Sequence, residues 1–213
     1  TQNFTMGVNQ FTDLTTEEFK AQFVGGLKTE VGSYGCKTFT SSASGAPDTI
    51  DWRSKGAVTS VKDQGQCGSC WTFSSTGAVE GAWAISKGEL IDLAEQELVD
   101  CATGRDYGSH GCNGGQMEGA FKYIIENGQC SLSSYPYTAK DGTCQKCTAV
   151  AHMSSCSDVK PNDQVSLKGA VAQQPVSIAI EADTKYFQSY SSGILTSSDC
   201  GTNLDHGVLI AGY

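Results

Sequence analysis

Residues 63–73 read Asp63-Gln64-Gly65-Gln66-Cys67-Gly68-Ser69-Cys70-Trp71-Thr72-Phe73. The apolar residues that follow recur at helical spacing, and Gly88 lies beyond them, which predicts a helix over residues 69–86. Cys70 would lie in the first turn of this helix, where unpaired backbone N–H groups and the positive end of the helix dipole favour a thiolate. The glycine and serine before it permit close approach of a substrate carbonyl to the Cys70 N–H. The stretch therefore predicts a cysteine nucleophile.

A nucleophilic thiol needs a base, and the chain has three histidines. His206 lies in Leu204-Asp205-His206-Gly207-Val208, at the entry of a predicted strand that would hold the ring rigidly. His110 and His152 lie in loops rich in glycine or serine, and we interpret both as ordinary surface histidines. Gln64 lies six residues before Cys70 and offers a side-chain amide as a second oxyanion donor. His206 is thus the candidate base.

Composition excludes several classes of protein. The 213-residue chain has 14 basic and 23 acidic side chains and a formal net charge of −9. A negative surface repels nucleic acid and anionic membranes, so we expect neither as a partner. Hydrophobic residues make 38% and charged residues 17% of the chain, which suits a globular core and argues against a disordered or coiled-coil protein. No apolar run approaches the about 18 residues that indicate a membrane-spanning helix.

Ten cysteines, spread from Cys36 to Cys200, favour an oxidising compartment. Two Cys-x-x-Cys pairs, at residues 67/70 and 144/147, lie much further apart than the about 15 to 20 residues of a zinc ribbon. We therefore expect no metal site and no other cofactor.

The chain is predicted to begin with a separate unit, residues 1–26. It has an extended run around residues 6–11, and then Thr15 and Glu18 form a capping box that begins a helix running to about Val24. Residues 27–46 are rich in Gly, Ser, Thr and Lys without apolar periodicity, which predicts an exposed linker that proteases would cut.

Residues 47–213 are predicted to form the main domain. In the helix over residues 69–86, the apolar face is expected to include Trp71, Ala78, Ala82 and Ile85. Further helices are predicted over residues 94–100, 116–127 and 163–173, and strands over residues 176–180 and 207–213. Because helices come first and strands follow, the fold class is α+β with two subdomains.

The chain resembles the papain family of cysteine peptidases, in its cathepsin L-like branch, over essentially its whole length. The motifs that carry the resemblance are Gln64-x-x-Cys67-Gly68-Ser69-Cys70-Trp71, Asp51-Trp52-Arg53 with Gly56-Ala57-Val58, Cys112-Asn113-Gly114-Gly115, Tyr135-Pro136-Tyr137, Gln174-Pro175-Val176-Ser177 and Asp205-His206. Cys70 and His206 are also 136 positions apart, within the about 130 to 150 typical of papain and the cathepsins.

The resemblance implies a helical subdomain, a β-barrel-like subdomain and a reaction mechanism. Cys70 would be the nucleophile, His206 the general acid/base and Gln64 the oxyanion donor. The first two would form a thiolate–imidazolium pair that attacks the peptide carbonyl, forms an acyl-enzyme and is freed by water.

The resemblance also implies a substrate site. Met117, Ala179 and Leu204 would line the pocket for the second residue upstream of the cut, beside Asp205, and the Gly115 backbone would pair with the substrate. An apolar wall prefers Leu, Phe or Val.

For the disulfides, the resemblance implies Cys67 with Cys112 and Cys101 with Cys144. Cys147 remains an alternative partner for Cys101. The resemblance implies no pairing for Cys36, Cys130, Cys147 and Cys156. A bond of Cys130 with Cys147 or with Cys156 is open, Cys36 lies in the linker, and the partner of Cys200 is expected downstream.

The amino-terminal unit resembles part of an inhibitory prosegment. Gly7-x-Asn9-x-Phe11-x-Asp13 matches a propeptide motif, and the helix that begins at Thr15 follows it in the same order. The resemblance implies a prosegment remnant at residues 1–26, which would cross the cleft in the non-productive direction. A linker with the activation cleavage region follows at residues 27–46, and an incomplete peptidase domain at residues 47–213. We expect a monomer, in a lysosome or vacuole or secreted, whose partners are peptide or protein substrates and its own prosegment.

Two other functions are open on sequence alone. The Cys67/Cys70 pair at a helix start imitates a thiol–disulfide oxidoreductase, although no βαβ pattern precedes it. A non-catalytic protein is the other alternative. The family's catalytic Asn follows the histidine, whereas Asn203 precedes His206, so we expect that Asn beyond Tyr213. We therefore expect an active endopeptidase as the parent protein, and a poorly folded, nearly inactive piece when these 213 residues stand alone.

Overall fold

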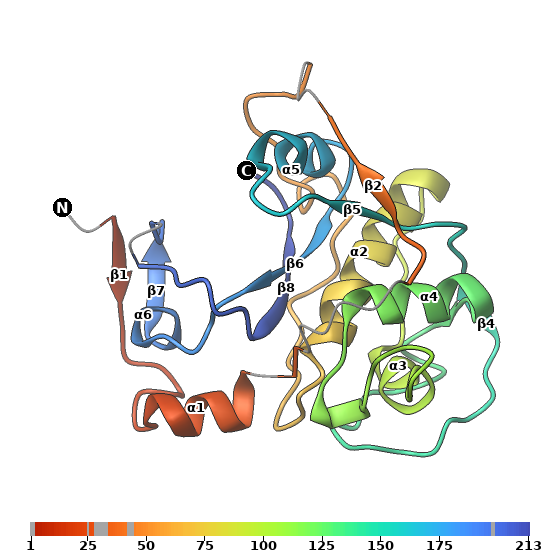
Figure 1. The fold of residues 1–213 in the computed structure, drawn as a ribbon, viewed down its shortest axis with the longest axis horizontal. Coiled ribbons are helices and arrows are strands. Elements are labelled where there is room, and N and C mark those ends of the chain that lie inside the picture. The colour runs from red at the N-terminus through yellow and green to blue at the C-terminus, as the bar shows by residue number, and fades with distance from the viewer. Residues whose placement is uncertain (1–2, 25, 28–33, 42–44, 197–198) are drawn as a thin grey trace.

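The structure is a computed structural model that describes residues 3–24, 26–27, 34–41, 45–196 and 199–213 (Figure 1). Its helices are α1 (Thr16–Phe23), α2 (Cys70–Lys87), α3 (Glu95–Cys101), α4 (Met117–Asn127), α5 (Gln164–Val171) and α6 (Lys185–Gln188), with a short 3-10 helix at Gly111–Asn113. Its strands are β1 (Phe4–Met6), β2 (Lys37–Phe39), β3 (Gln129–Cys130), β4 (Ala149–Ala151), β5 (Ser157–Val159), β6 (Val176–Ile180), β7 (Tyr190–Gly193) and β8 (His206–Ile210). Among the described residues the strands form the pairs β1–β7, β2–β5, β3–β4 and β6–β8.

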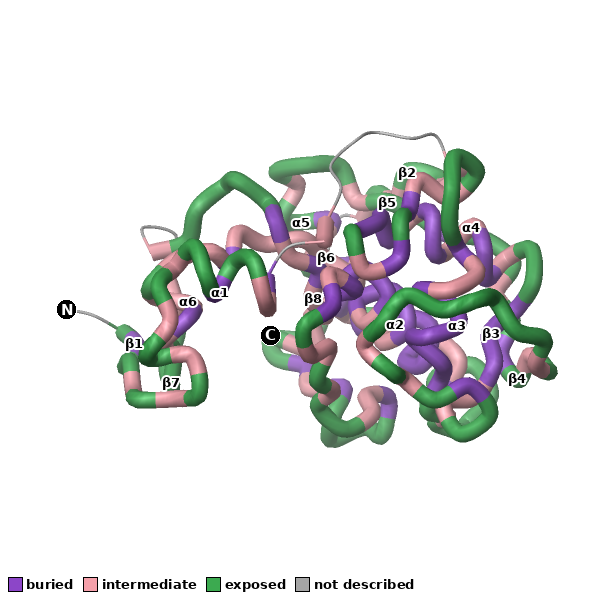
Figure 2. The backbone as a smooth tube through the Cα atoms, turned by 90° about the horizontal axis from the view of Figure 1, so that it is seen from below, coloured by how far each residue is buried: buried purple, intermediate pink, exposed green. Residues whose placement is uncertain are grey.

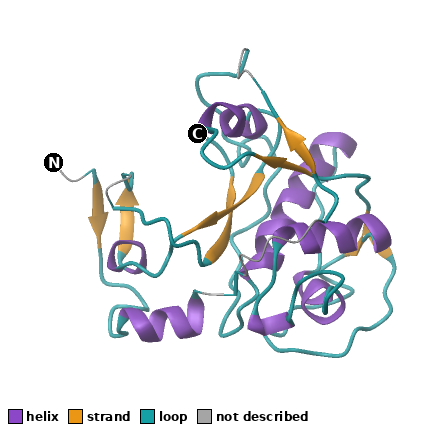
Figure 3. Cartoon of the chain, viewed as in Figure 1, coloured by secondary structure: helices purple, strands orange, loops and turns teal. Residues whose placement is uncertain are grey.

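The helices and strands gather in different parts of the molecule. Figure 3 shows α2, α3 and α4 together on one side, and the β6–β8 pair beside α2. The other end holds α1, α6 and the β1–β7 pair (Figure 1). This arrangement confirms the α+β class. None of the helices in the described ranges has the length and apolar composition needed to cross a bilayer.

Helix α2 is the central element, and it begins at Cys70, one residue after the predicted start, so Cys70 lies in its first turn as predicted. It ends where Gly88 adopts a left-handed conformation, with φ of 75°. Trp71 is fully buried in a core with Leu93, Leu98 and Ile124, and its indole N–H donates to the Gly111 carbonyl at 3.2 Å.

The predicted apolar face of α2 was partly wrong, because Ile85 is 45% exposed near the end of the helix. Besides Trp71, Val79 and Glu80, the buried residues of the helix are small. A Cβ at Gly81 would lie 2.5 Å from the Pro175 ring, and one at Gly77 would lie 2.9 Å from Leu209. The two glycines therefore let Leu209 of β8, and Pro175 just before β6, pack directly on the backbone of α2.

Strands β6 and β8 are antiparallel, and Ala179 lies opposite Gly207 and Ile180 opposite His206. Strand β8 ends at Ile210, before the predicted Tyr213. Beyond it, Ile50 exchanges backbone hydrogen bonds with Tyr213, both at 2.9 Å, so the start of the main domain extends this sheet.

The amino-terminal unit folds partly as predicted. Helix α1 has the predicted capping box between Thr15 and Glu18, and Phe19 packs in a cluster with Ala182. The extended run over residues 6–11 was wrong, because β1 ends at Met6. Asn9 then forms a turn in which its side-chain oxygen accepts the Phe11 N–H at 2.9 Å.

The predicted linker, residues 27–46, contains regular structure. Within it β2 pairs with β5 in a parallel ladder, and Leu27 forms an isolated bridge to Gly115. The description of an exposed linker therefore does not hold over its whole length. Residues 28–33 and 42–44 of this range lie outside the described part of the chain.

The structure contains four disulfides among the described residues. Two are the pairs that the resemblance implied, Cys67–Cys112 and Cys101–Cys144. The other two are Cys130–Cys147 and Cys36–Cys156. Cys200 is exposed and outside these bridges.

A buried carboxylate on α2 gives a first testable prediction. The Glu80 side chain accepts the Leu93 N–H at 2.8 Å and the Thr59 hydroxyl at 2.7 Å, and Lys62 lies 3.6 Å away. Burial raises the pKa of Glu80 from 4.5 to about 6, so between these values the folded state binds more protons than the unfolded state. Stability from this group is therefore fully present below pH 4.5 and is lost as the pH rises through 6.

We expect the free energy of unfolding of the full-length protein to gain about 2 kcal/mol between pH 7 and pH 4.5, relative to a Glu80→Gln variant. Denaturant unfolding at several pH values measures this difference, and contributions from other groups cancel in the comparison. Glu89→Gln, at an exposed site just after α2, should leave the pH dependence unchanged. Parallel stability curves for wild type and Glu80→Gln would contradict the assignment.

Candidate active site

Cys70 is the first residue of α2, and its side chain is 1% exposed. Burial raises the pKa of its thiol to about 11, although hydrogen bonds from the backbone N–H groups of Gly207 and Trp71 act in the opposite direction. The Gly207 hydrogen bond places the sulfur against the start of β8, next to His206. The Trp71 contact is the helix-start donor that the sequence predicted.

His206 is the first residue of β8, and its strand pairing with Ile180 fixes its backbone. The imidazole packs edge-on against the Phe187 ring, with centroids 6.3 Å apart. Burial lowers the pKa of His206 to about 4. Its Nδ1 atom is buried and has no hydrogen-bond partner within the described ranges. This nitrogen is therefore available to receive a proton.

The site is closed by the amino-terminal unit in this structure. The Gly26 carbonyl accepts the Gly115 N–H at 2.6 Å, and a Cβ at Gly26 would overlap the Gly68 carbonyl oxygen. Residues 26–27 therefore run between the loop that precedes Cys70 and the loop that precedes α4. Cys70 is buried and His206 is half-buried, and desolvation favours the neutral form of each side chain, which raises the pKa of the thiol and lowers the pKa of the imidazole.

Gln64 lies in the loop that leads into α2. Its side-chain amide donates to the Cys67 carbonyl at 2.9 Å, which leaves its second amide hydrogen for another acceptor. The backbone carbonyl of Gln64 accepts a hydrogen bond from the Tyr137 hydroxyl at 2.7 Å, and that hydroxyl also lies 2.6 Å from the Ser69 hydroxyl. Tyr137 thus fixes the loop on both sides, a role that its motif alone did not indicate.

The predicted pocket residues are only partly brought together. Met117 is buried at the start of α4, and its sulfur lies 3.3 Å from the place of a Cβ at Gly207. Ala179 lies opposite Gly207 in the sheet, and it packs against the core cluster that contains Met117, as Leu27 does. Leu204 is 43% exposed ahead of β8, so the structure does not bury it in this wall.

Asp205 connects the site to α1. One carboxylate oxygen accepts the Ala182 N–H at 2.8 Å, and the other lies 3.8 Å from the Lys20 ammonium. Lys20 also forms a hydrogen-bonded ion pair with Asp183. Burial raises the pKa of Asp205, while the Lys20 charge acts to lower it. Neither Lys20 nor Asp183 was predicted as a site residue, and the one local signal was that Lys20 is a basic residue in the last turn of α1.

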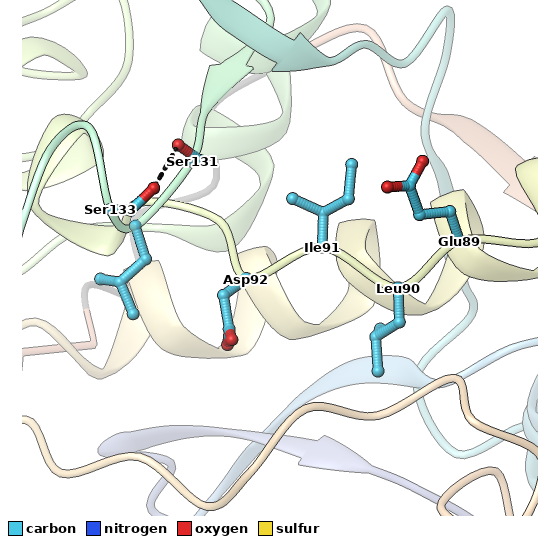
Figure 4. A pocket seen from close by; sticks show the side chains of 7 residues that line it. Glu89, Leu90, Ile91, Asp92, Ser131 and Ser133 are labelled. Carbon is cyan, nitrogen blue, oxygen red and sulfur yellow. Dashed lines mark hydrogen bonds between the residues drawn. The ribbon is translucent and has the colours of Figure 1, made fainter.

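Two other features of the molecule lie apart from this site. One is a pocket of about 450 Å³ lined by residues 89–92 and 131–133, which include none of the candidate catalytic residues. Figure 4 shows side chains that line it. Glu97, Cys130 and Cys147 cluster at distances that suit a metal ion. However, both sulfurs are in one disulfide, and the Glu97 carboxylate already accepts the Cys130 N–H at 2.7 Å and the Tyr123 hydroxyl at 3.2 Å. The three candidate metal ligands are therefore already engaged in the disulfide and in hydrogen bonds.

Comparison with known proteins agrees with the fold and with the position of Cys70 at the start of α2. Residues 46–213 match the family described as papain family cysteine protease. The chain belongs to this family. The chain is 49% identical to the Arabidopsis thaliana "Probable cysteine protease RD21C", and the match covers 100% of this chain and 48% of that protein. It is 48% identical to "Cysteine protease 1" of Oryza sativa subsp. japonica, over 99% of this chain and 44% of that protein. The chain thus spans about half the length of the curated relatives it matches.

Solved structures of papain-family precursors share the fold. "Recombinant stem bromelain precursor" is 40% identical, with a TM-score of 0.89, over 99% of this chain and 67% of that one. The digestive procathepsin L 3 of Tenebrio molitor larval midgut is 42% identical, with a TM-score of 0.90, over 100% of this chain and 68% of that one. These proforms match along the amino-terminal unit as well as the main domain.

The disulfides bear on the oxidoreductase alternative. Cys67 is bonded to Cys112, whereas Cys70 carries a thiol. The Cys67/Cys70 couple that thiol–disulfide exchange needs is therefore not formed.

Proposed function

We propose that the full-length protein is a cysteine endopeptidase made as a zymogen. The observation that carries the proposal is the position of Cys70. It lies in the first turn of α2, the Gly207 N–H lies beside its sulfur, and His206 directly precedes Gly207 on β8. A thiol, an imidazole and helix-start donors at one point are the requirements for acyl transfer. Four disulfides also fit a secreted or vacuolar protein.

The residues would act in the following way. The thiol proton passes to His206 as the Cys70 sulfur adds to the peptide carbonyl carbon. The carbonyl oxygen takes negative charge between the Cys70 N–H and the Gln64 amide. His206 then protonates the leaving amine, and a thioester to Cys70 remains. Water attacks this thioester, His206 takes its proton, and the peptide acid and the thiol are released.

We propose that the second subsite is apolar. Met117 and Ala179 both lie beside Gly207, and Leu27 packs against the core cluster that contains Met117 in the closed structure. Substrates with Leu, Phe or Val at this position should be cleaved faster than those with charged residues.

The test of the function is covalent labelling of the activated full-length protein with an irreversible epoxide inhibitor that reacts with thiolates. We expect one equivalent of label on Cys70 and loss of peptide hydrolysis in proportion to labelling. Cys70→Ser should abolish both. A folded, activated protein that is neither labelled nor able to hydrolyse peptides would support the non-catalytic alternative and overturn the proposal.

We further propose that residues 1–26 form the end of an inhibitory prosegment, with an activation cleavage region in residues 27–46 and the peptidase domain at residues 47–213. Support comes from the contact of Gly26 with Gly68 and Gly115, which blocks access to Cys70, and from the proforms that match the whole chain.

The ion pairs of Lys20 give a prediction for this inhibition. Lys20→Ala removes the cation between Asp183 and Asp205, and the precursor should activate about two- to fivefold faster at neutral pH, since a partly exposed pair contributes about 1 kcal/mol or less. The measurement is the time course of activity after the purified precursor is diluted into assay buffer. Glu17→Ala, an exposed change on the same helix, should activate like the wild type. Equal rates for the wild type and Lys20→Ala would show that the ion pairs do not hold the prosegment.

A further inference from the structure

The segment that follows the proposed prosegment is fastened to the peptidase domain by a covalent bond. Cys36 is bonded to Cys156, and the Lys37 N–H donates to the Cys156 carbonyl at 3.0 Å. Strand β2 then pairs with β5 in register, with Lys37 opposite Ser157 and Phe39 opposite Val159.

The same segment is held again at its far end. The Ser41 N–H donates to the Ser166 hydroxyl at 3.1 Å, and that hydroxyl donates back to the Ser41 carbonyl at 3.3 Å. Ser166 is buried at the start of α5. Residues 36–41 therefore lie along β5 and α5 as part of the domain's surface layer.

The proposed prosegment is held differently. Its attachment includes the pairing of β1 with β7, the Lys20 ion pairs, the packing of Phe19 beside Ala182 and the Gly26 contacts, and each of these is non-covalent. Figures 1 and 2 show α1 at one end of the molecule and the β2–β5 pair near α5 and α4, away from α1. The residues that close the active site and the residues that carry the disulfide are thus separate.

We propose that residues 36–41 remain in the activated enzyme as a disulfide-held extension of the peptidase domain, and that the prosegment leaves only after a cut on the amino-terminal side of Cys36. This inference rests on the proposed zymogen, and it narrows the activation region of residues 27–46. Hydrolysis adds water across one peptide bond and leaves the disulfide intact. A single cut after Cys36 would keep residues 1–36 joined to the domain through Cys156, so the inhibitory residues would stay at high local concentration beside the cleft.

The first experiment activates the full-length precursor at acidic pH without reductant, blocks thiols with N-ethylmaleimide, and maps the active enzyme by mass spectrometry without reduction. We expect a disulfide-linked peptide pair that contains Cys36 and Cys156, together with an amino terminus at or before Cys36. An active enzyme that lacks residues 36–41 would overturn the inference and leave the proposed function intact.

The second experiment does not depend on activity. A Cys70→Ala precursor is cut with pepsin and separated by size. The peptide that contains Cys36 should stay with the domain until a reductant is added, and its release without reductant would overturn the inference. A Cys36→Ser/Cys156→Ser precursor, which leaves no unpaired thiol at either position, is the matched control and should lose this peptide at a measurable rate under non-reducing conditions.

Discussion

Replacing His206 by alanine in the full-length enzyme is expected to lower kcat/KM for peptide hydrolysis by about 10⁴-fold or more. The half-buried imidazole has an Nδ1 atom without a hydrogen-bond partner among the described residues, and it lies one residue from the Gly207 N–H that contacts the Cys70 sulfur. Without the ring, the thiol has no base to take its proton, and the leaving amine has no acid to protonate it.

The measurement has a second readout that a merely structural role would not change. In the wild type, alkylation of Cys70 in the activated enzyme should depend on pH through the imidazole as well as the thiol. In His206→Ala that dependence should follow the thiol alone. Alanine at His110 or His152, both exposed, should change kcat/KM less than twofold. A His206→Ala enzyme with wild-type activity would remove His206 from the reaction.

The parts of the site that sequence predicts are those set by local chemistry. Cys70 precedes a helical apolar pattern and follows a Gly-Ser pair, and helix starts depend on a few adjacent residues. The capping box at Thr15 and Glu18 is equally local, and it appears in the structure as predicted. His206 was predicted because an apolar run that indicates a strand follows it and because it lies 136 positions after Cys70.

The parts that sequence does not predict depend on long-range contacts. Cys36 and Cys156 are 120 residues apart, and nothing near either of them indicates the other. Ile85 has the spacing of a buried residue, but in its turn of α2 the residue that is buried, in a cluster with Trp52, is Ala84, and Ile85 is 45% exposed. Lys20 looks like an ordinary solvated lysine until the fold brings Asp183 and Asp205 beside it.

The second large effect is expected at Gly26, where the backbone crosses the active site with φ of 107°. A β-branched residue is strained there by about 1–3 kcal/mol. In Gly26→Val the new Cβ would also overlap the Gly68 carbonyl oxygen and disturb the hydrogen bond from the Gly115 N–H. Together these costs reach about 3 kcal/mol, so we expect the purified precursor to show about 100-fold more peptidase activity at neutral pH than the wild-type precursor.

Gly35→Val separates contact from backbone strain in this prediction. Gly35 also has a positive φ, of 84°, but a Cβ there would meet no atom of the described residues within 4 Å. Its variant carries a similar backbone strain without touching the cleft, and its precursor should stay as inactive as the wild type. If both variants were equally active, strain in the amino-terminal segment would explain the result. If neither were active, the contact of Gly26 with Gly68 and Gly115 would not be what closes the site. If only Gly26→Val is active, the inhibition depends on the close approach of the Gly26 backbone to the backbone of Gly68 and Gly115. This close approach explains why all three positions are glycines.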